Sequence, residues 1–223
     1  MIKIHHLGHS QSERIVWLCE EMNIPYELVR YTRDPVTRLS PPALRALHPL
    51  GAAPVIEDGN VMLAESAAIV EYLAVMYGAD YPLMKPGPSH AHYPDYLYWF
   101  HFANGNLQST LARLMTVTRA TLPAGHPVLT SVQDRFTRIL ELLEERLAVV
   151  PWLAGAEFTL ADIMSVFSLT TMRLFQPVDL APWPHIRAYL ARIGARPAYQ
   201  RAMARSDPDL TPLLTSLLTS PLN

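Results

Sequence analysis

Strand patterns are confined to the first eighty residues of the chain, and this asymmetry constrains the fold more than any other feature. Alternating and 3.6-residue apolar patterns predict a strand over 2–6, a helix over 12–22 and a strand over 26–31. From about residue 95 onward only helical periodicity is left. We therefore expect a small mixed α/β domain followed by an all-helical domain.

The remaining N-terminal segments complete a small sheet. A short helix over 42–47 precedes a strand pair, 55–56 and 61–63, and a helix over 67–76 follows. Together with the β-α-β start, this is a thioredoxin-like layout. Residues 1–78 are assigned to this domain, residues 79–93, rich in proline and glycine, to a linker, and residues 94–223 to the helical domain.

Composition excludes several classes of protein. The chain has 223 residues, 50% of them apolar, which is enough for a sizeable core, and its net charge of -2 gives no attractive field for nucleic acid. No run approaches the roughly 18 apolar residues of a membrane span, and the N-terminus does not resemble a signal peptide. The single cysteine, Cys19, lies on the apolar stripe of the first helix, so we expect a core residue in a cytoplasmic protein.

The segment from Ala53 to Ser66 has the order expected of a site for an amino-acid-like ligand. Pro54 at the start of a strand leaves backbone groups of the preceding residue outside the ladder. Ser66 as a helix N-cap offers N–H donors to an anion, and Glu65 adds a negative charge beside it. Such a pair suits a zwitterion, as in a free amino acid or the γ-glutamyl end of glutathione. Ser66 alone is equally typical of an ordinary cap.

The turn between the first strand and the first helix carries two candidate serines. Ser10 lies at the positive end of the helix, where a bound thiolate would be stabilised. Ser10 and Glu13 also match a capping box, a role compatible with donating the hydroxyl hydrogen to sulfur. Ser12 is a rival that spacing alone does not exclude. His9 suggests a serine hydrolase, but the first domain lacks the Gly-x-Ser-x-Gly elbow.

These motifs in this order resemble the glutathione transferase family, and most closely its serine-type, theta-like group of bacteria and fungi. No tyrosine precedes Tyr26, which argues against the tyrosine-type classes. The resemblance spans nearly the whole chain. It is carried by Ser10 to Arg14, Tyr31 to Asp34, His48 to Val55, Glu65 to Ile69, and a structural capping box with a hydrophobic staple at Phe158 to Ile163.

The resemblance implies roles for individual residues. Ser10 would donate to the thiolate of glutathione, and the bond before Pro54 would be cis. Ala53 would bind the cysteinyl part through its backbone, and Glu65 and Ser66 would hold the γ-glutamyl end.

One position departs from the family pattern. Relatives often carry Lys or Arg where this chain has Ala52, and that cation can meet the glycyl carboxylate of glutathione. His48, Arg33 or Arg14 would have to supply the charge instead.

The same resemblance implies an enzyme of detoxification that conjugates glutathione, as co-substrate and without a metal, to small hydrophobic electrophiles. The electrophile pocket is expected between the domains, with Tyr98, Phe102 and Asn106 in its lining, and the family is usually homodimeric. Two alternatives stay open: a glutathione-dependent peroxidase or disulfide reductase, and a noncatalytic ligand- or protein-binding module on the same fold.

Overall fold

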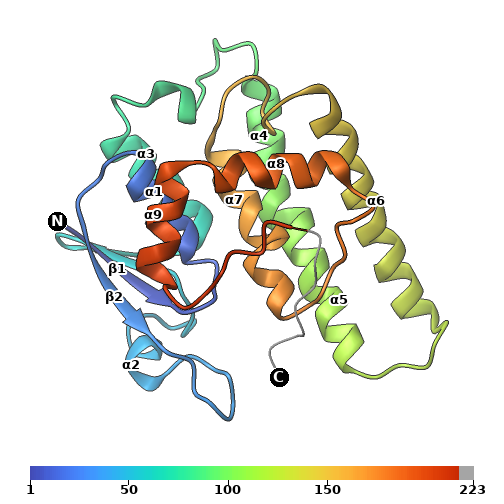
Figure 1. The fold of residues 1–223 in the computed structure, drawn as a ribbon. Helices are drawn as coiled ribbons and strands as arrows, with labels where there is room; N and C mark the ends of the chain where they lie inside the picture. The colour runs from blue at the N-terminus through green and yellow to red at the C-terminus, as the bar shows by residue number, and fades with distance from the viewer. Residues whose placement is uncertain (216–223) are drawn as a thin grey trace. The chain divides into compact units, whose positions relative to one another are not determined.

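The computed structural model describes residues 1–215, which form two compact units (Figure 1). The first unit comprises Met1–Pro82 and Gly194–Pro212. The second comprises Leu83–Ile193 and the described residues from Leu213 onward. One unit contains a mixed sheet with helices and the other contains helices, which confirms the predicted fold class.

A four-stranded mixed sheet is the centre of the first unit. Its strands are β1 (Ile2–Leu7), β2 (Tyr26–Tyr31), β3 (Val55–Asp58) and β4 (Val61–Ala64), in the order β2-β1-β3-β4. β2 is parallel to β1, so the chain needs a crossover, which α1 (Glu13–Glu21) supplies. β3 is antiparallel to both β1 and β4. Gly59 takes φ +59° in the tight β3-β4 turn, a conformation that suits glycine.

Apolar faces of the sheet and of α1 and α3 (Ser66–Tyr77) form the core of this unit. The buried side chains include Ile4, Ile15, Leu18, Cys19, Ile56, Ile69 and Leu73. The expected core position of Cys19 is therefore confirmed. The short helix α2 (Pro42–Arg45) contributes Leu44, which packs with Leu7 and Ala53.

The helix α9 (Pro197–Ser206) packs against α1, and Figure 1 shows the two side by side. The ring of Tyr199 meets that of Trp17 edge to face at 5.0 Å. Ion pairs add to this contact: Arg196 to Glu21 at 2.6 Å, and Arg201 and Arg205 to Glu20 at 2.7 and 2.8 Å. Residues 194–212 thus belong to the first unit, whereas the sequence placed all of 94–223 in the helical domain.

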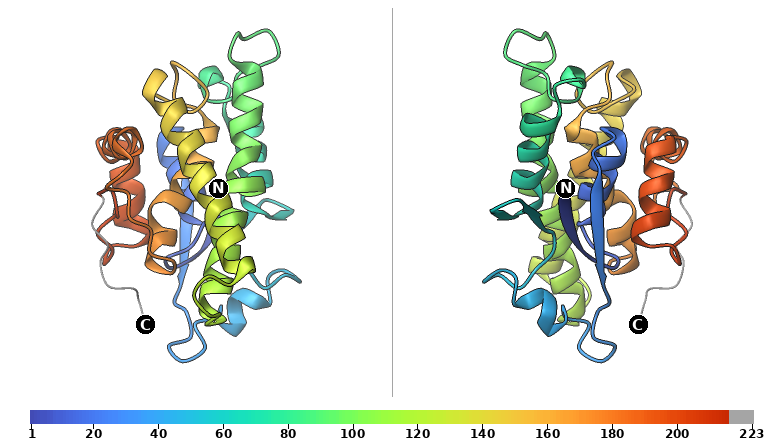
Figure 2. Two further views of the ribbon diagram at one scale, coloured as in Figure 1. Left: turned by 90° about the vertical axis from the view of Figure 1, so that its right-hand side faces the viewer. Right: turned by 90° about the vertical axis from the view of Figure 1, so that its left-hand side faces the viewer.

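The second unit consists of helices. In chain order they are α4 (Tyr93–Phe102), the π-helical segment η2 (Ala103–Gln108), α5 (Ser109–Arg119), α6 (Pro127–Val149), α7 (Leu160–Leu169), the 3-10 segment η3 (Thr171–Leu174) and α8 (Pro184–Gly194), with the 3-10 segment η1 (Pro82–Met84) before them. α6 runs back beside α5 (Figure 2). α7 is buried along its whole length and forms the core. The single helix expected over 95–120 is divided by η2. Within residues 1–215, none of the helices combines the length and the apolar character needed to cross a bilayer.

The predicted capping box at the start of α7 is present. Thr159 Oγ1 accepts the Ala161 N–H at 3.3 Å, and Asp162 Oδ2 accepts the Thr159 N–H at 2.9 Å. Asp162 Oδ1 also accepts from the Leu153 N–H and from the Tyr189 hydroxyl, both at 3.0 Å. Burial raises the pKa of Asp162 to about 6 despite these donors. Since both oxygens are used within the fold, the motif is structural.

Candidate active site

The turn between β1 and α1 presents Ser10 as a hydrogen-bond donor. Its Oγ donates to the Leu7 carbonyl at 2.7 Å, accepts the Ser12 N–H at 3.3 Å and lies 2.6 Å from Ser12 Oγ. The expected capping box with Glu13 is wrong, because the N-cap of α1 is Ser12 and no side chain caps the helix. The Ser10 hydroxyl contacts the N-cap residue Ser12 through its oxygen.

Ser12 is more enclosed than Ser10. Its side chain is completely buried, whereas Ser10 keeps 6% of its surface exposed. Ser12 Oγ accepts the Leu7 N–H at 3.2 Å and contacts His6 Nδ1 at 2.8 Å. With partners on both sides, Ser12 has less freedom than Ser10 to contact a ligand.

The loop before β3 reaches the serine turn through a glutamine. The Ala53–Pro54 peptide bond is cis, as the resemblance implies. Gln11, next to Ser10, donates from Nε2 to the Ala53 carbonyl at 3.3 Å. Ala53 is thereby tied to the same turn as Ser10.

The start of α3 differs by one residue from the prediction. Ser66 was expected to be the N-cap, but the N-cap is Glu65, which adopts φ 73° and ψ 110°, and Ser66 is the first helical residue. The Ser66 hydroxyl faces inward. It accepts from Arg14 Nη1 at 3.0 Å and contacts Gln11 Oε1 at 3.4 Å. The backbone N–H groups of this first turn have no partner within the helix, so they can bind an anion.

Arg14 is a buried cation that joins these parts. Its Nη1 donates to Gln11 Oε1 at 3.1 Å as well as to Ser66 Oγ. Burial lowers the pKa of Arg14 to about 9, and the charges of Glu13 and Glu65 oppose this shift, so the guanidinium stays protonated at neutral pH. Ser10, Ala53, Glu65 and Ser66 thus lie around Gln11 and Arg14. The bridging role of Gln11 was missed, although Gln11 lies within the Ser10 to Arg14 motif.

Two non-glycine residues with positive φ border the site. His9, with φ 54°, precedes Ser10, and Glu65, with φ 73°, precedes Ser66. Such conformations cost on the order of 1–3 kcal/mol each and persist where the surroundings hold them. They therefore fix the direction of the chain as it enters the Ser10 turn and α3, respectively.

Arg33 and His48, two of the residues that were expected to supply the charge missing at Ala52, lie in different surroundings. Arg33 donates from Nε to the Gly8 carbonyl at 3.2 Å and from Nη2 to the His9 carbonyl at 3.4 Å, so it supports the serine turn. His48 accepts the Leu50 N–H at 3.3 Å in its own loop and takes no part in the contacts that join Ser10, Ala53 and Ser66.

The three residues predicted for the electrophile pocket meet in the helical unit. They line a cavity of about 210 Å³ together with Arg135, Arg138, Ile139 and Leu142. The rings of Tyr98 and Phe102 stack at 5.7 Å, and Asn106 Oδ1 accepts from Arg135 at 2.9 Å. All of the residues that line this cavity belong to the helical unit.

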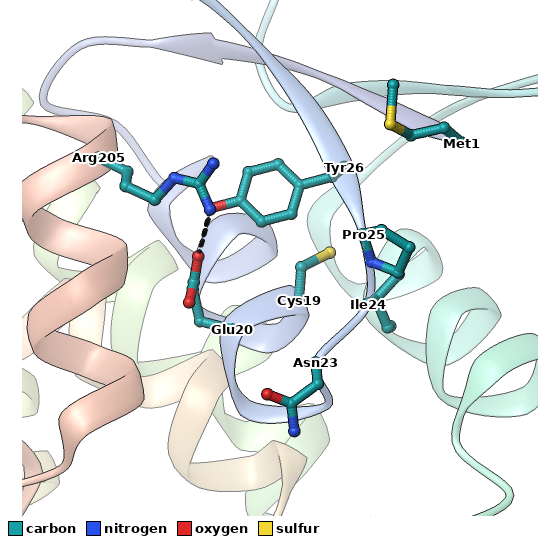
Figure 3. Close-up of a pocket in the computed structure, with 8 residues that line it drawn as sticks. All are labelled: Met1, Cys19, Glu20, Asn23, Ile24, Pro25, Tyr26 and Arg205. Carbon is teal, nitrogen blue, oxygen red and sulfur yellow. Dashed lines mark hydrogen bonds and ion pairs between the residues drawn. The ribbon is translucent and has the colours of Figure 1, made fainter.

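A second cavity, of about 360 Å³, lies beside Cys19 in the first unit (Figure 3). Glu20 points toward Arg205 there and also accepts from the Tyr26 hydroxyl at 2.8 Å. Burial strongly raises the pKa of Cys19, so this thiol does not serve as a nucleophile. Because its charged groups already bind one another, this cavity is not a candidate active site.

Comparison with known proteins agrees with this geometry. Models of the glutathione S-transferase N-terminal and C-terminal domains match residues 10–76 and 112–197. Glutathione S-transferase 3 of Zea mays is 30% identical over 200 residues, which cover 86% of this chain and 87% of the relative.

Solved structures extend the match. A glutathione S-transferase of Actinobacillus pleuropneumoniae has 31% identity and a TM-score of 0.83 over 93% of each chain. A theta-class glutathione S-transferase of Xanthomonas axonopodis pv. citri, solved with glutathione bound, has 27% identity and a TM-score of 0.67 over 90% of this chain and 96% of that one. With the cis bond before Pro54, the Ser10 turn and the α3 start joined in one unit, these similarities show that the chain belongs to the glutathione transferase family.

Proposed function

We propose that this glutathione transferase activates glutathione as a thiolate at Ser10 and conjugates it to small hydrophobic electrophiles. The observation that carries the proposal is the junction of the Ser10 turn, Ala53 and Ser66 through Gln11 and Arg14. A peptide-like ligand lying along this junction would place its thiol at one end and its amino-acid end at the other.

The γ-glutamyl end belongs at the start of α3. Its carboxylate would accept from the backbone N–H groups of the first helical turn, with the helix dipole favouring the negative charge. Its ammonium group would pair with the exposed carboxylate of Glu65. Buried Arg14 adds positive charge behind Ser66 and strengthens carboxylate binding.

The cysteinyl part belongs at Ala53, whose backbone would pair with it, and the sulfur then lies at the Ser10 turn. There the Ser10 hydroxyl donates to the thiolate. A hydrogen bond to a charged group contributes about 1.5–3 kcal/mol and one pKa unit corresponds to about 1.36 kcal/mol, so Ser10 lowers the thiol pKa by roughly one to two units from about 8.5. The N-terminus of α1 adds to this stabilisation.

In the reaction, the thiol releases its proton to solvent water and the thiolate attacks an electrophilic carbon. A sulfur–carbon bond forms, and a leaving group departs with its electron pair or, in an addition, the electrons move onto the acceptor. We place the apolar part of the electrophile beside Tyr98, Phe102 and Asn106. The rings of Tyr98 and Phe102 suit a flat, apolar group, and Arg135 and Arg138 form the charged part of the same lining.

A homodimer fits the surface of the first unit. β4 and α3 expose five large apolar side chains, namely Val61, Met62, Val75, Met76 and Tyr77. Apolar surface gathered in this way is typical of an interaction site. We propose that a second copy of the chain covers it, in the cytoplasm, where a protein with a single buried cysteine is stable without disulfides.

Titration of glutathione by calorimetry, with ultraviolet absorbance of the thiolate followed against pH, tests the proposal. We expect saturable binding and a bound-thiol pKa well below about 8.5. In Ser10→Ala the pKa should rise by roughly one to two units while binding is retained.

Other outcomes would favour other functions. No binding at millimolar glutathione would contradict the proposal and favour a module for another ligand, and unchanged turnover in Ser10→Ala would favour a noncatalytic role for this serine. Loss of thiolate in Ser12→Ala but not in Ser10→Ala would move the donor to Ser12. Accumulation of oxidised glutathione would indicate a peroxidase or disulfide reductase.

A further inference from the structure

A row of buried polar groups leads from the C-terminal end of α9 to Ser10. Asp207, directly after α9, places Oδ2 3.1 Å from His6 Nε2. His6 Nδ1 lies 2.8 Å from Ser12 Oγ, which lies 2.6 Å from Ser10 Oγ. All four residues belong to the first unit, and all four are buried. The proposed function uses only Ser10 among these four residues.

Asp207 also holds the turn directly. Its Oδ1 accepts the His9 N–H at 3.0 Å and lies 3.9 Å from His9 Nε2. Burial alone would raise the pKa of Asp207, but His6, His9 and their hydrogen bonds outweigh it, and the net pKa is lowered. The charge of Arg33 also faces this carboxylate. Asp207 is therefore an anion in contact with the strand and the turn that precede α1.

The order of donors along this row depends on which hydroxyl donates in the 2.6 Å contact between Ser10 and Ser12, since either can do so. Where Ser10 gives its one hydrogen to the Leu7 carbonyl, it accepts from Ser12, and Ser12 in turn accepts from His6 Nδ1. In the reverse order Ser10 donates to Ser12, and Ser12 donates to His6 Nδ1. His6 Nε2 lies 3.1 Å from the Asp207 carboxylate in either order.

We propose that Asp207 is a positioning residue for the Ser10 hydroxyl and acts through His6 and Ser12 by favouring the first of these two orders. The inference rests on the proposed role of Ser10 as thiolate donor. With the donors running from His6 to Ser12 to Ser10, the Ser10 hydrogen is left for an outside acceptor, which is the Leu7 carbonyl at rest and the sulfur when glutathione is bound. In the reverse order the hydroxyl hydrogen of Ser10 goes to Ser12, and none is left for the sulfur of glutathione.

The test compares full-length variants by the thiol pKa of bound glutathione and by the separation of kcat from KM. Asp207→Ala should raise the bound-thiol pKa by about one unit, a tenfold loss of thiolate at neutral pH. KM for glutathione should stay near the parental value, and activity should recover in alkaline solution, where the thiol ionises unaided.

Two further variants separate this role from simple support of the fold. Asp207→Asn should rescue the effect, because its amide oxygen can accept the His9 N–H while its NH₂ donates to His6 Nε2 and leaves the hydrogen on Nδ1. Asp209→Ala is the matched control, since it removes a carboxylate from the same segment at an exposed position. It should keep the parental thiol pKa.

A parental thiol pKa in folded Asp207→Ala would overturn the inference. So would a loss of activity that is equal at every pH. If Asp207→Ala does not fold, nitrogen NMR of the parental protein labelled in histidine decides, because an unprotonated Nδ1 in His6 contradicts the donor order. Ser10→Ala separates the two ideas. If it leaves the bound-thiol pKa low, the role of Ser10 fails. If it raises that pKa and Asp207→Ala does not, only the role of Asp207 fails.

Discussion

Replacing Glu65 should reveal the backbone strain at the start of α3. Glu65 has φ 73° and ψ 110°, where a side chain is unfavourable by about 1–3 kcal/mol and glycine is not. Glycine gains unfolded-state entropy worth about 0.4–1 kcal/mol, which offsets part of the relief. Glu65→Gly should therefore be more stable than Glu65→Ala by about 1 kcal/mol, or roughly 2–4 °C in Tm for a chain of this size.

Thermal unfolding of both variants, followed by circular dichroism, measures this difference. Both variants lack the carboxylate that we assign to the ammonium group of glutathione, and both remove the same charge near Arg14. Calorimetry should therefore show the same loss of glutathione affinity in each. Stability should depend on which residue replaces Glu65, whereas affinity should not.

Equal Tm values for Glu65→Gly and Glu65→Ala would refute the reasoning about strain. A difference in glutathione affinity between the two variants would show that the backbone at this position, and not the carboxylate alone, determines binding.

Three further predictions concern other parts of the chain. Glu20→Gln should lower the free energy of unfolding by about 1–3 kcal/mol at pH 7, because it removes the carboxylate that pairs with Arg201 and Arg205. Burial raises the pKa of Glu20, but the hydrogen bonds from these arginines outweigh burial, so the net pKa is lowered. In denaturant titrations the difference between the two proteins should therefore fade as the pH falls below about 4.3, where the Glu20 carboxylate of the parent becomes protonated as well. Ala52→Arg should lower KM for glutathione roughly tenfold by supplying a partner for the glycyl carboxylate, and an unchanged KM in steady-state kinetics would contradict that assignment. Met76→Glu should shift the protein to a monomer in light scattering with its Tm nearly kept; a parental mass would show that the exposed face of α3 is not the interface.

Local patterns predicted much of the fold and of the site. The period-two and 3.6-residue patterns located the sheet and most of the helices, and motifs located Ser10, Ala53 and Glu65, because those features depend on neighbours in sequence. The exact cap of α3 was missed by one residue. A pattern of residue types cannot show that Glu65 takes a positive φ and that Ser66 turns inward to Arg14.

Contacts between distant segments could not be predicted. The pairing of Arg196 with Glu21 spans 175 positions, and the pairing of Asp207 with His6 spans more. Nothing in the local pattern of α9 distinguishes a helix that packs on α1 from one that packs in the helical unit. The division of the helix expected over 95–120 by η2 also depends on packing and not on composition.

The contact of α9 with α1 has a consequence for synthesis of the protein. The first unit takes residues from both ends of the chain, so at about 5–20 residues per second the ribosome needs on the order of ten seconds after Pro82 before α9 can emerge. During that time the surface of α1 around Trp17 and Glu20 is uncovered, and the helical unit is made while the first unit still lacks α9. A nascent chain stalled before Gly194 would therefore carry α1 without its covering helix, and would be recognisable to chaperones by that exposed face.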